Sequence, residues 1–218
     1  SRYVIPVVVH LVHGGTPQSG SAIPADQVRS QFELLFNDYR RLPETRGFGS
    51  GLDARVEFAL ATKDPQGRPT TGVVNYYRPN NISINIEADN KKLKTEIAPA
   101  WDQTKYLNIW LVSNITSTDV NDRGTVLGYA QFPATKDRST DGIVMVHWNL
   151  GASRTPGSTS IKYWATATHE LGHWLGLYHP FQNYECRSDN CRRTGDETCD
   201  TPPVATWQHK ITTKRINS

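Results

Sequence analysis

Apolar residues are grouped along the chain in patterns that predict alternating strands and helices. Residues Tyr3–Val12 form a run rich in valine and isoleucine, which is typical of a buried strand. After a loop rich in Gly, Pro and Ser, apolar residues recur at offsets of four, three and four: Val28, Phe32, Leu35 and Tyr39. This spacing predicts an amphipathic helix, and Pro24 and Asp26 suit its first turn.

Further strands and one more helix are predicted before the polar C-terminal part. The strand-like segments are Val56–Ala61, Tyr106–Val112, Thr125–Phe132 and Asp141–Trp148. Residues Ile82–Glu87 alternate between apolar and polar, which fits a short strand or an extended loop. Residues Asn90–Lys105 predict a helix that Pro99 starts, kinks or splits. We interpret its basic stretch Lys91–Lys94 as the solvent-exposed face of that helix.

Composition and charge limit the classes of function. The 218 residues suit one domain, or one domain divided into two lobes by a cleft. Hydrophobic residues make up 37% and charged residues 21%, a balance that is typical of globular proteins. The net charge is only +3 without a dense basic cluster, and no apolar run approaches the ~18 residues of a membrane span. We therefore expect neither a nucleic-acid partner nor a membrane partner.

The polar segment from Tyr178 to Ser218 contains all three cysteines of the chain, Cys186, Cys191 and Cys199. Their spacing lacks the CxxC pairs of a zinc ribbon. A local disulfide in an exported protein is favoured over free thiols. Because the number of cysteines is odd, one of them has no partner within the chain.

The stretch HELGHWLGLYH, from His169 to His179, has the spacing of a metal site. On a helix, His169 and His173 project from one face, one turn apart, and both reach one zinc ion. Glu170 is placed to act as general base on a water at that metal. Gly176 is expected to end the helix and turn the chain, so that His179 becomes a third ligand and a fourth position stays open.

The alternative is a helix with scattered histidines that bind no metal. The match of five specified residues to one template favours the zinc site. The opposite face of this helix is apolar and is expected to pack against the sheet: Trp164, Ala167, Leu171, Trp174 and Leu175. One face of the helix is therefore expected to pack in the core, and the other to carry the metal-binding histidines.

The stretch also resembles the zinc signature HExxHxxGxxH of the metzincin metallopeptidases, and within them the pappalysin (cytophagalysin-like, M43) family. The supporting segments are HELGHWLGLYHPFQ, GDETCDTPP at Gly195–Pro203, LGYAQFP at Leu127–Pro133 and IPVVVH at Ile5–His10. The resemblance implies an α/β (α+β) fold: a twisted mixed sheet with a backing helix and an active-site helix. A small, irregular C-terminal lobe, truncated here, is expected to follow.

Roles for individual residues follow from the same resemblance. His169, His173 and His179 would bind zinc, and Glu170 would be the catalytic general base and acid. The segment Gly128, Tyr129 and Ala130 would bind the substrate backbone as an edge strand. A calcium ion is implied near four oxygen-bearing residues: Asp196, Glu197, Asp200 and Thr201.

The chain departs from the family pattern in its C-terminal part. Metzincins have a methionine turn after the third histidine, whereas the one methionine here, Met145, lies upstream. We expect residues 1–176 to form the upper catalytic subdomain and residues 177–218 a partial lower subdomain without this turn. A C-terminal piece is expected to be absent, although a complete, degenerate chain is the alternative.

The sequence thus predicts a secreted zinc endopeptidase that cleaves proteins or peptides, with a preference for basic residues as some family members have. Its own removed pro-segment or a C-terminal fragment is a further expected partner. The competing interpretation is a fragment that binds zinc and peptide without cleaving. Turnover of a labelled peptide separates the two.

Overall fold

The computed structural model describes residues 2–16, 23–43, 52–79, 83–118, 125–133, 135, 137–151, 165–182, 191–199 and 201. The chain divides into two compact units, residues 1–175 and residues 176–218. Within the described residues, no helix combines the length and apolarity that crossing a membrane requires.

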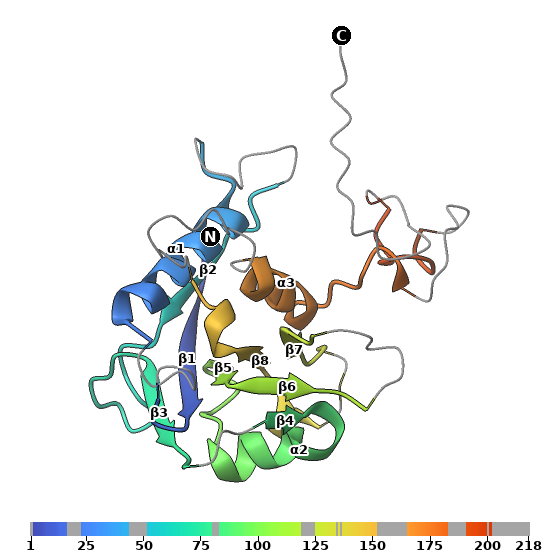
Figure 1. Ribbon diagram of the computed structural model, residues 1–218. Helices are drawn as coiled ribbons and strands as arrows, with labels where there is room; N and C mark the ends of the chain where they lie inside the picture. The colour runs from blue at the N-terminus through green and yellow to red at the C-terminus, as the bar shows by residue number, and fades with distance from the viewer. Residues whose placement is uncertain are drawn as a thin grey trace, which may run out of the picture. The chain divides into compact units, whose positions relative to one another are not determined.

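The first unit is built on a six-stranded mixed sheet in the order β2-β1-β5-β8-β7, with β3 also paired to β1 (Figure 1). Its strands are β1 (Tyr3–His13), β2 (Val56–Leu60), β3 (Val73–Tyr77), β5 (Leu107–Val112), β7 (Gly128–Ala130) and β8 (Ile143–Val146). All pairings are parallel except that of β7 with β8, which is antiparallel. The strand β7 therefore forms an edge that runs against its neighbours.

The long strand β1 organises this sheet. Its first half pairs with β2 from Tyr3↔Val56 onward, and its second half pairs with β3 from Val9↔Val73 onward. Its other side pairs with β5, in the register Val7↔Leu107. The buried strands β5 and β8 are apolar almost throughout, as expected for strands covered on both faces.

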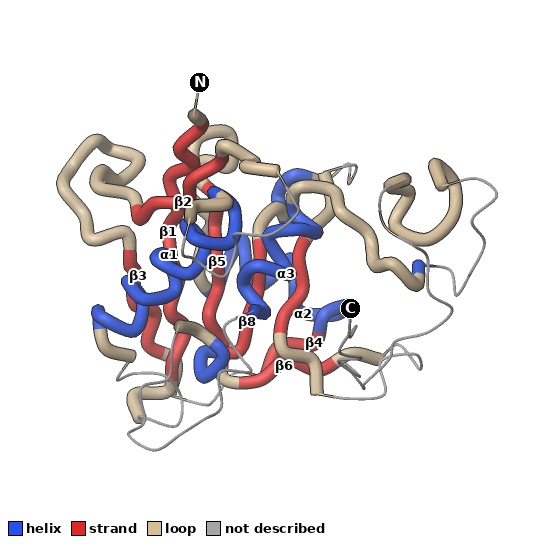
Figure 2. The backbone as a smooth tube through the Cα atoms, turned by 90° about the horizontal axis from the view of Figure 1, so that it is seen from above, coloured by secondary structure: helices blue, strands red, loops and turns tan. Residues whose placement is uncertain are grey.

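Helices cover both faces of the sheet, as Figures 1 and 2 show. On one face, α1 (Ala25–Arg40) and α3 (Ala165–Trp174) enclose a core with the strands. Members of this core include Val9, Leu35, Met145, Ala167 and Leu171. The opposite face carries a second core around Trp110, Val144 and Leu93. This arrangement confirms the predicted α/β class with a mixed sheet, a backing helix and the histidine-bearing helix.

The helical segment on the second face differs from its prediction. After the short strand β4 (Ser83–Asn85), helix α2 spans Ile86–Lys92 and continues as a π-helical turn at Leu93–Ile97. Asn85 starts the helix because its side-chain oxygen accepts a hydrogen bond from the backbone N–H of Ala88. The predicted helix Asn90–Lys105 thus begins earlier and ends before Pro99.

Two strands were not predicted, and one is shorter than predicted. β3 and β6 (Asn114–Thr116, paired with β4) consist of short, partly polar segments. β7 covers only Gly128–Ala130 of the predicted Thr125–Phe132. Short strands at a sheet edge carry little periodic signal, which explains both differences.

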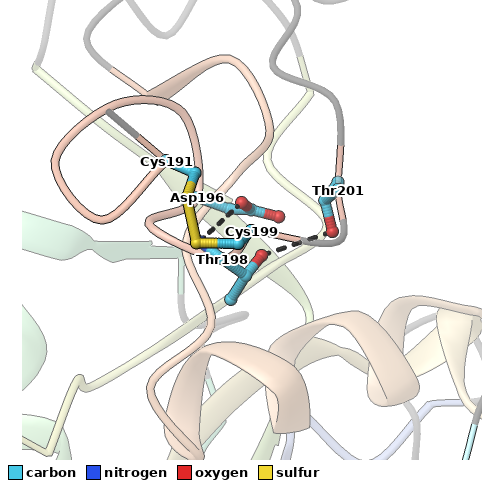
Figure 3. Close-up of a disulfide and its surroundings, with 5 residues drawn as sticks. All are labelled: Cys191, Asp196, Thr198, Cys199 and Thr201. Carbon is cyan, nitrogen blue, oxygen red and sulfur yellow. Dashed lines mark hydrogen bonds between the residues drawn. A yellow bond between two sulfur atoms is a disulfide. The ribbon is translucent and has the colours of Figure 1, made fainter. Parts of the chain in front are cut away.

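The second unit contains the predicted local disulfide, which joins Cys191 and Cys199 (Figure 3). Their Cα atoms are 4.8 Å apart. Near the disulfide, the backbone N–H of Thr198 donates to the Asp196 carboxylate, and the Thr198 hydroxyl donates to the hydroxyl of Thr201. Cys186 lies outside the described residues.

Candidate metal centre

Helix α3 brings two histidines of the motif together. The Nε2 atoms of His169 and His173 are 2.9 Å apart, and their rings meet edge to face. This is the outcome of the four-residue spacing on a helix. The ring of Phe132, a residue that follows β7, lies 5.2 Å from the His173 ring. Phe132 was not predicted as a site residue, although it lies in the quoted segment LGYAQFP.

The chain turns at Gly176 as predicted. The last helical hydrogen bond runs from Leu175 N to Leu171 O, and Gly176 then adopts φ +102°, a left-handed conformation that favours glycine. Downstream, the ring of His179 stacks on Phe181 at 4.7 Å.

One ring nitrogen from each of His169, His173 and His179 lies within 4.8 Å of the others. In the part of the chain that the structure describes, this is the one group of three or more metal-ligating side chains of this kind. Three imidazoles with no fourth protein ligand are the donor set of a catalytic zinc site. The residues present therefore fit a zinc ion.

Glu170 lies buried next to these histidines, with 5% of its surface exposed. Burial raises the pKa of its carboxyl to about 8, because desolvation opposes the charged form. A cation held by the neighbouring histidines would favour the carboxylate and lower this pKa again. The side chain faces the backbone of Gly128 in β7.

Side chains from two other segments hold α3 in place. The hydroxyl of Tyr39 in α1 donates to Thr168 O at 3.0 Å, and the Thr168 hydroxyl donates to the Asp38 carboxylate. The indole N–H of Trp174 donates to Asp141 Oδ1 at 2.9 Å. These bonds, together with the burial of Ala167 and Leu171, fix the face that carries the histidines.

The apolar face of α3 was predicted correctly in its centre and wrongly at its end. Ala167 and Leu171 are buried and Trp174 packs partly against the core, but Leu175 is 41% exposed. Leu175 instead lines a pocket of about 320 Å³ with Trp174 and with residues of the segment 131–141. Leu175 stays outside the core because the helix ends beside it. Trp164 lies outside the described residues.

The three residues predicted to bind substrate form β7. Their register with β8 is Gly128↔Met145, Tyr129↔Val144 and Ala130↔Ile143. β7 is the last strand of the sheet order, and α3 packs against it. The backbone of one side of β7 thus has no strand neighbour among the described residues.

The predicted calcium residues are described only in part. Asp196 accepts a backbone hydrogen bond from Thr198, and Glu197 adopts a left-handed φ of 61°. Thr201 accepts a hydrogen bond from Thr198, while Asp200 lies outside the described residues. The metal-ligating group found among the described residues does not include Asp196 or Glu197.

The sequence matches one family model and a set of fungal proteins. The model, described as pregnancy-associated plasma protein-A of the peptidase M43 group, covers residues 89–218. An extracellular metalloprotease of Podospora anserina is 27% identical over 205 residues, which are 92% of this chain and 56% of that protein. One from Pyricularia oryzae is 25% identical over 207 residues, 94% of this chain and 58% of that protein. The chain thus spans just over half the length of these relatives.

Solved structures show the same fold. Mature mirolysin of Tannerella forsythia, in complex with a cleaved peptide, superposes with a TM-score of 0.76 at 30% identity. The match covers 95% of this chain and 74% of that one. A promirolysin variant of the same organism gives a TM-score of 0.75 and covers 65% of that chain.

Proposed function

This chain belongs to the M43 peptidase family of metzincins, and from that premise we propose that it is a zinc-dependent endopeptidase. The observation that carries the proposal is the gathering of three histidine nitrogens within 4.8 Å of one another, beside a buried glutamate. His169, His173 and His179 would hold the ion. When bound, zinc lowers the pKa of a coordinated water and polarises the scissile carbonyl.

We assign Glu170 the role of general base and acid. It follows His169 directly in α3 and lies against Gly128, so its carboxylate would lie beside a water on the ion. The carboxylate takes a proton from the attacking water and later gives it to the departing amine. Its burial excludes bulk water, which would otherwise compete for that proton.

The edge strand β7 offers the substrate a place to bind. A peptide added antiparallel to β7 extends the sheet and places its backbone next to Glu170, because Gly128 contacts that side chain. Backbone donors and acceptors of Gly128, Tyr129 and Ala130 then give affinity with little regard to sequence. This mode suits an enzyme that acts on peptide chains.

The decisive experiment compares the parental chain with a Glu170→Gln variant. We expect the parental chain to cleave casein and the variant to lose activity by roughly 10³-fold, within the range of general acid–base effects. Zinc content, measured by atomic emission, should stay at the parental level, because the three histidines remain. Parental turnover by the variant would refute the role of Glu170.

A second candidate function is a zinc- and peptide-binding fragment without catalytic turnover. It uses the same three histidine nitrogens, which would hold an ion whether or not a bound peptide is cleaved. Both candidates predict stoichiometric zinc and peptide binding. Absence of turnover with intact zinc and peptide binding would select the fragment.

Three finer properties are part of the proposal. We infer from the resemblance a preference for Arg or Lys at the cleavage site, which sequencing of the products from a peptide library would test. Secretion agrees with the disulfide and with the fungal relatives, which are named extracellular. A removed pro-segment is a further expected partner, and binding of the separate peptide would reveal it.

Calcium is proposed at Asp196, Glu197, Asp200 and Thr201, because these residues bring hard oxygen donors close together in the sequence. Calcium should then raise the melting temperature of the parental protein and have a smaller effect on an Asp196→Asn variant. Equal melting curves with calcium and with chelator would remove this site from the proposal.

A further inference from the structure

Lys94 is a cation buried on the second face of the sheet, behind the edge strand. It lies in the π-helical turn Leu93–Ile97 and is 1% exposed. Its Nζ donates to Thr140 O at 2.6 Å and lies 5.1 Å from the ring centre of Trp110 and 5.4 Å from that of Tyr129. Among the described residues, no carboxylate forms an ion pair with it.

Burial of this ammonium group is unfavourable in itself. Desolvation lowers the pKa of Lys94 to about 7, and the charge of Asp141 opposes that shift. An apolar side chain of similar size at position 94 would fill the same space and stabilise the fold at least as well. The contacts of Lys94 therefore call for a reason other than stability.

Two more side chains of the same helical segment contact β7 and its connection to β8. The Tyr129 hydroxyl donates to Asn90 Oδ1 at 2.9 Å. Lys91 Nζ lies 3.2 Å from Asp137 Oδ2, in the connection from β7 to β8. Asn90 and Lys94 are one helical turn apart, so they share a face.

These contacts matter because β7 is a short edge strand, which the sheet holds from one side. It pairs with β8 over three residues, and the backbone bonds from Val146 N to Leu127 O and from Gln131 N to Gly142 O flank this pairing. Its other side has no strand neighbour among the described residues. Lys94 contacts two parts of the β7–β8 pair: the ring of Tyr129 within β7, and the backbone of Thr140 shortly before β8. Lys94 thus joins β7 to the segment that leads into β8.

We propose that Lys94 is a positioning residue, which holds the edge strand β7 at the place where it pairs with the substrate backbone. The inference rests on the proposed peptidase function and adds a residue that supports the substrate-binding strand. Lys94 contacts neither substrate nor metal, and it acts through Tyr129 and Thr140. Its loss should therefore weaken peptide binding and leave the zinc site unchanged.

The test is a Lys94→Met variant, with Lys92→Met as matched control. Lys92 belongs to the same segment and is solvent-exposed. For a fluorogenic casein-derived peptide, we expect Lys94→Met to raise KM about tenfold while kcat changes less than about twofold, the signature of lost binding. Lys92→Met should match the parental protein. Inhibition by acetohydroxamic acid, which needs only the metal, should be equal in all three.

A purely structural role would give a different pattern. It would lower the melting temperature and the zinc content of Lys94→Met and reduce kcat in step, and that result would overturn the proposal. An unchanged KM would overturn it too. If Lys94→Met does not fold, Lys94→Gln takes its place: it removes the charge that lies near the rings of Trp110 and Tyr129, and an unchanged KM for it would count against the proposal.

The proposal is separable from the peptidase function. In a Glu170→Gln background, calorimetry measures binding of the same peptide without cleavage. Lys94→Met should weaken that binding about tenfold, or by about 1.4 kcal/mol. If the parental chain does not cleave but Lys94→Met weakens peptide binding, the peptidase function is refuted and the role of Lys94 is supported. If the parental chain cleaves but Lys94→Met binds the peptide with parental affinity, the peptidase function is supported and the role of Lys94 is refuted.

Discussion

The backbone of Gly128 lies directly against the side chain of Glu170. A Cβ atom at position 128 would be 3.1 Å from Cγ and 3.2 Å from Oε1 of Glu170, and 3.1 Å from the carbonyl oxygen of Val144. The sheet fixes that carbonyl, so only the glutamate is free to move. The absence of a side chain at position 128 therefore creates the space that the carboxylate occupies.

Gly128→Ala should displace the Glu170 carboxylate by a few tenths of an ångström. Because general-base catalysis depends on position, we expect kcat to fall by about tenfold or more, with an unchanged zinc content. Steady-state kinetics and metal analysis check this. A variant with parental kcat would show that Glu170 has room to adapt.

Removal of the metal should abolish activity reversibly. After treatment with 1,10-phenanthroline we expect no cleavage of casein, and added zinc should restore it, because three histidines without a fourth ligand bind the ion exchangeably. His179→Ala should lower zinc affinity by about an order of magnitude or more. Zinc binding at parental affinity by this variant would exclude His179 as a ligand.

Because His10 is buried, we expect the protein to lose stability in acid. Its ring is buried, stacks on Trp110 at 5.0 Å and bonds Asn108 Oδ1 at 2.8 Å. Desolvation lowers the pKa of His10 from 6.5 to about 4, although the bond to Asn108 acts in the opposite direction. Between these pH values the unfolded chain binds a proton that the folded chain does not. The free energy of unfolding should therefore fall as pH falls through this window, by on the order of 3 kcal/mol.

Denaturant titrations at a series of pH values test this with a matched pair of variants. His10→Gln should be less stable near neutral pH but should show a flatter dependence below about pH 6.5. His13→Gln, in the same strand at a less buried position, should keep the parental slope. Equal slopes for all three proteins would remove His10 as the source of the acid dependence.

The bond from Tyr39 to Thr168 should contribute to stability. Tyr39→Phe removes only the hydroxyl that donates to the carbonyl in α3, and we expect a loss of about 1 kcal/mol in unfolding free energy. Tyr77→Phe, whose side chain is 59% exposed, serves as control and should change little. Chemical denaturation of both variants decides this.

The sequence predicts best those elements whose pattern reflects burial. β1, α1, β5 and β8 were predicted because long apolar runs or regular offsets coincide with the cores on the two faces of the sheet. The placement of the motif around Glu170 was equally predictable, because residues at fixed spacing on a helix lie at fixed relative positions. The roles of its residues stay predictions until metal and turnover are measured.

What the sequence hides is set by tertiary packing. The basic stretch Lys91–Lys94 was interpreted as a solvent-exposed face, which is correct for Lys91 and Lys92 and wrong for Lys94. Whether a lysine lies inside or outside depends on aromatic rings from distant strands, here Trp110 and Tyr129. The contact of Gly128 with Glu170 likewise joins positions that no periodicity relates.

The reversed direction of β7 determines how a peptide would run in the antiparallel pairing proposed for the substrate. A peptide that lies antiparallel to β7 runs the same way as β8, β5 and β1. Backbone pairing alone therefore sets the amino-to-carboxyl direction of the peptide, independently of its side chains. A retro-peptide, with the same residues in opposite order, would meet every side-chain contact from the wrong end, and its composition alone would not make it a substrate.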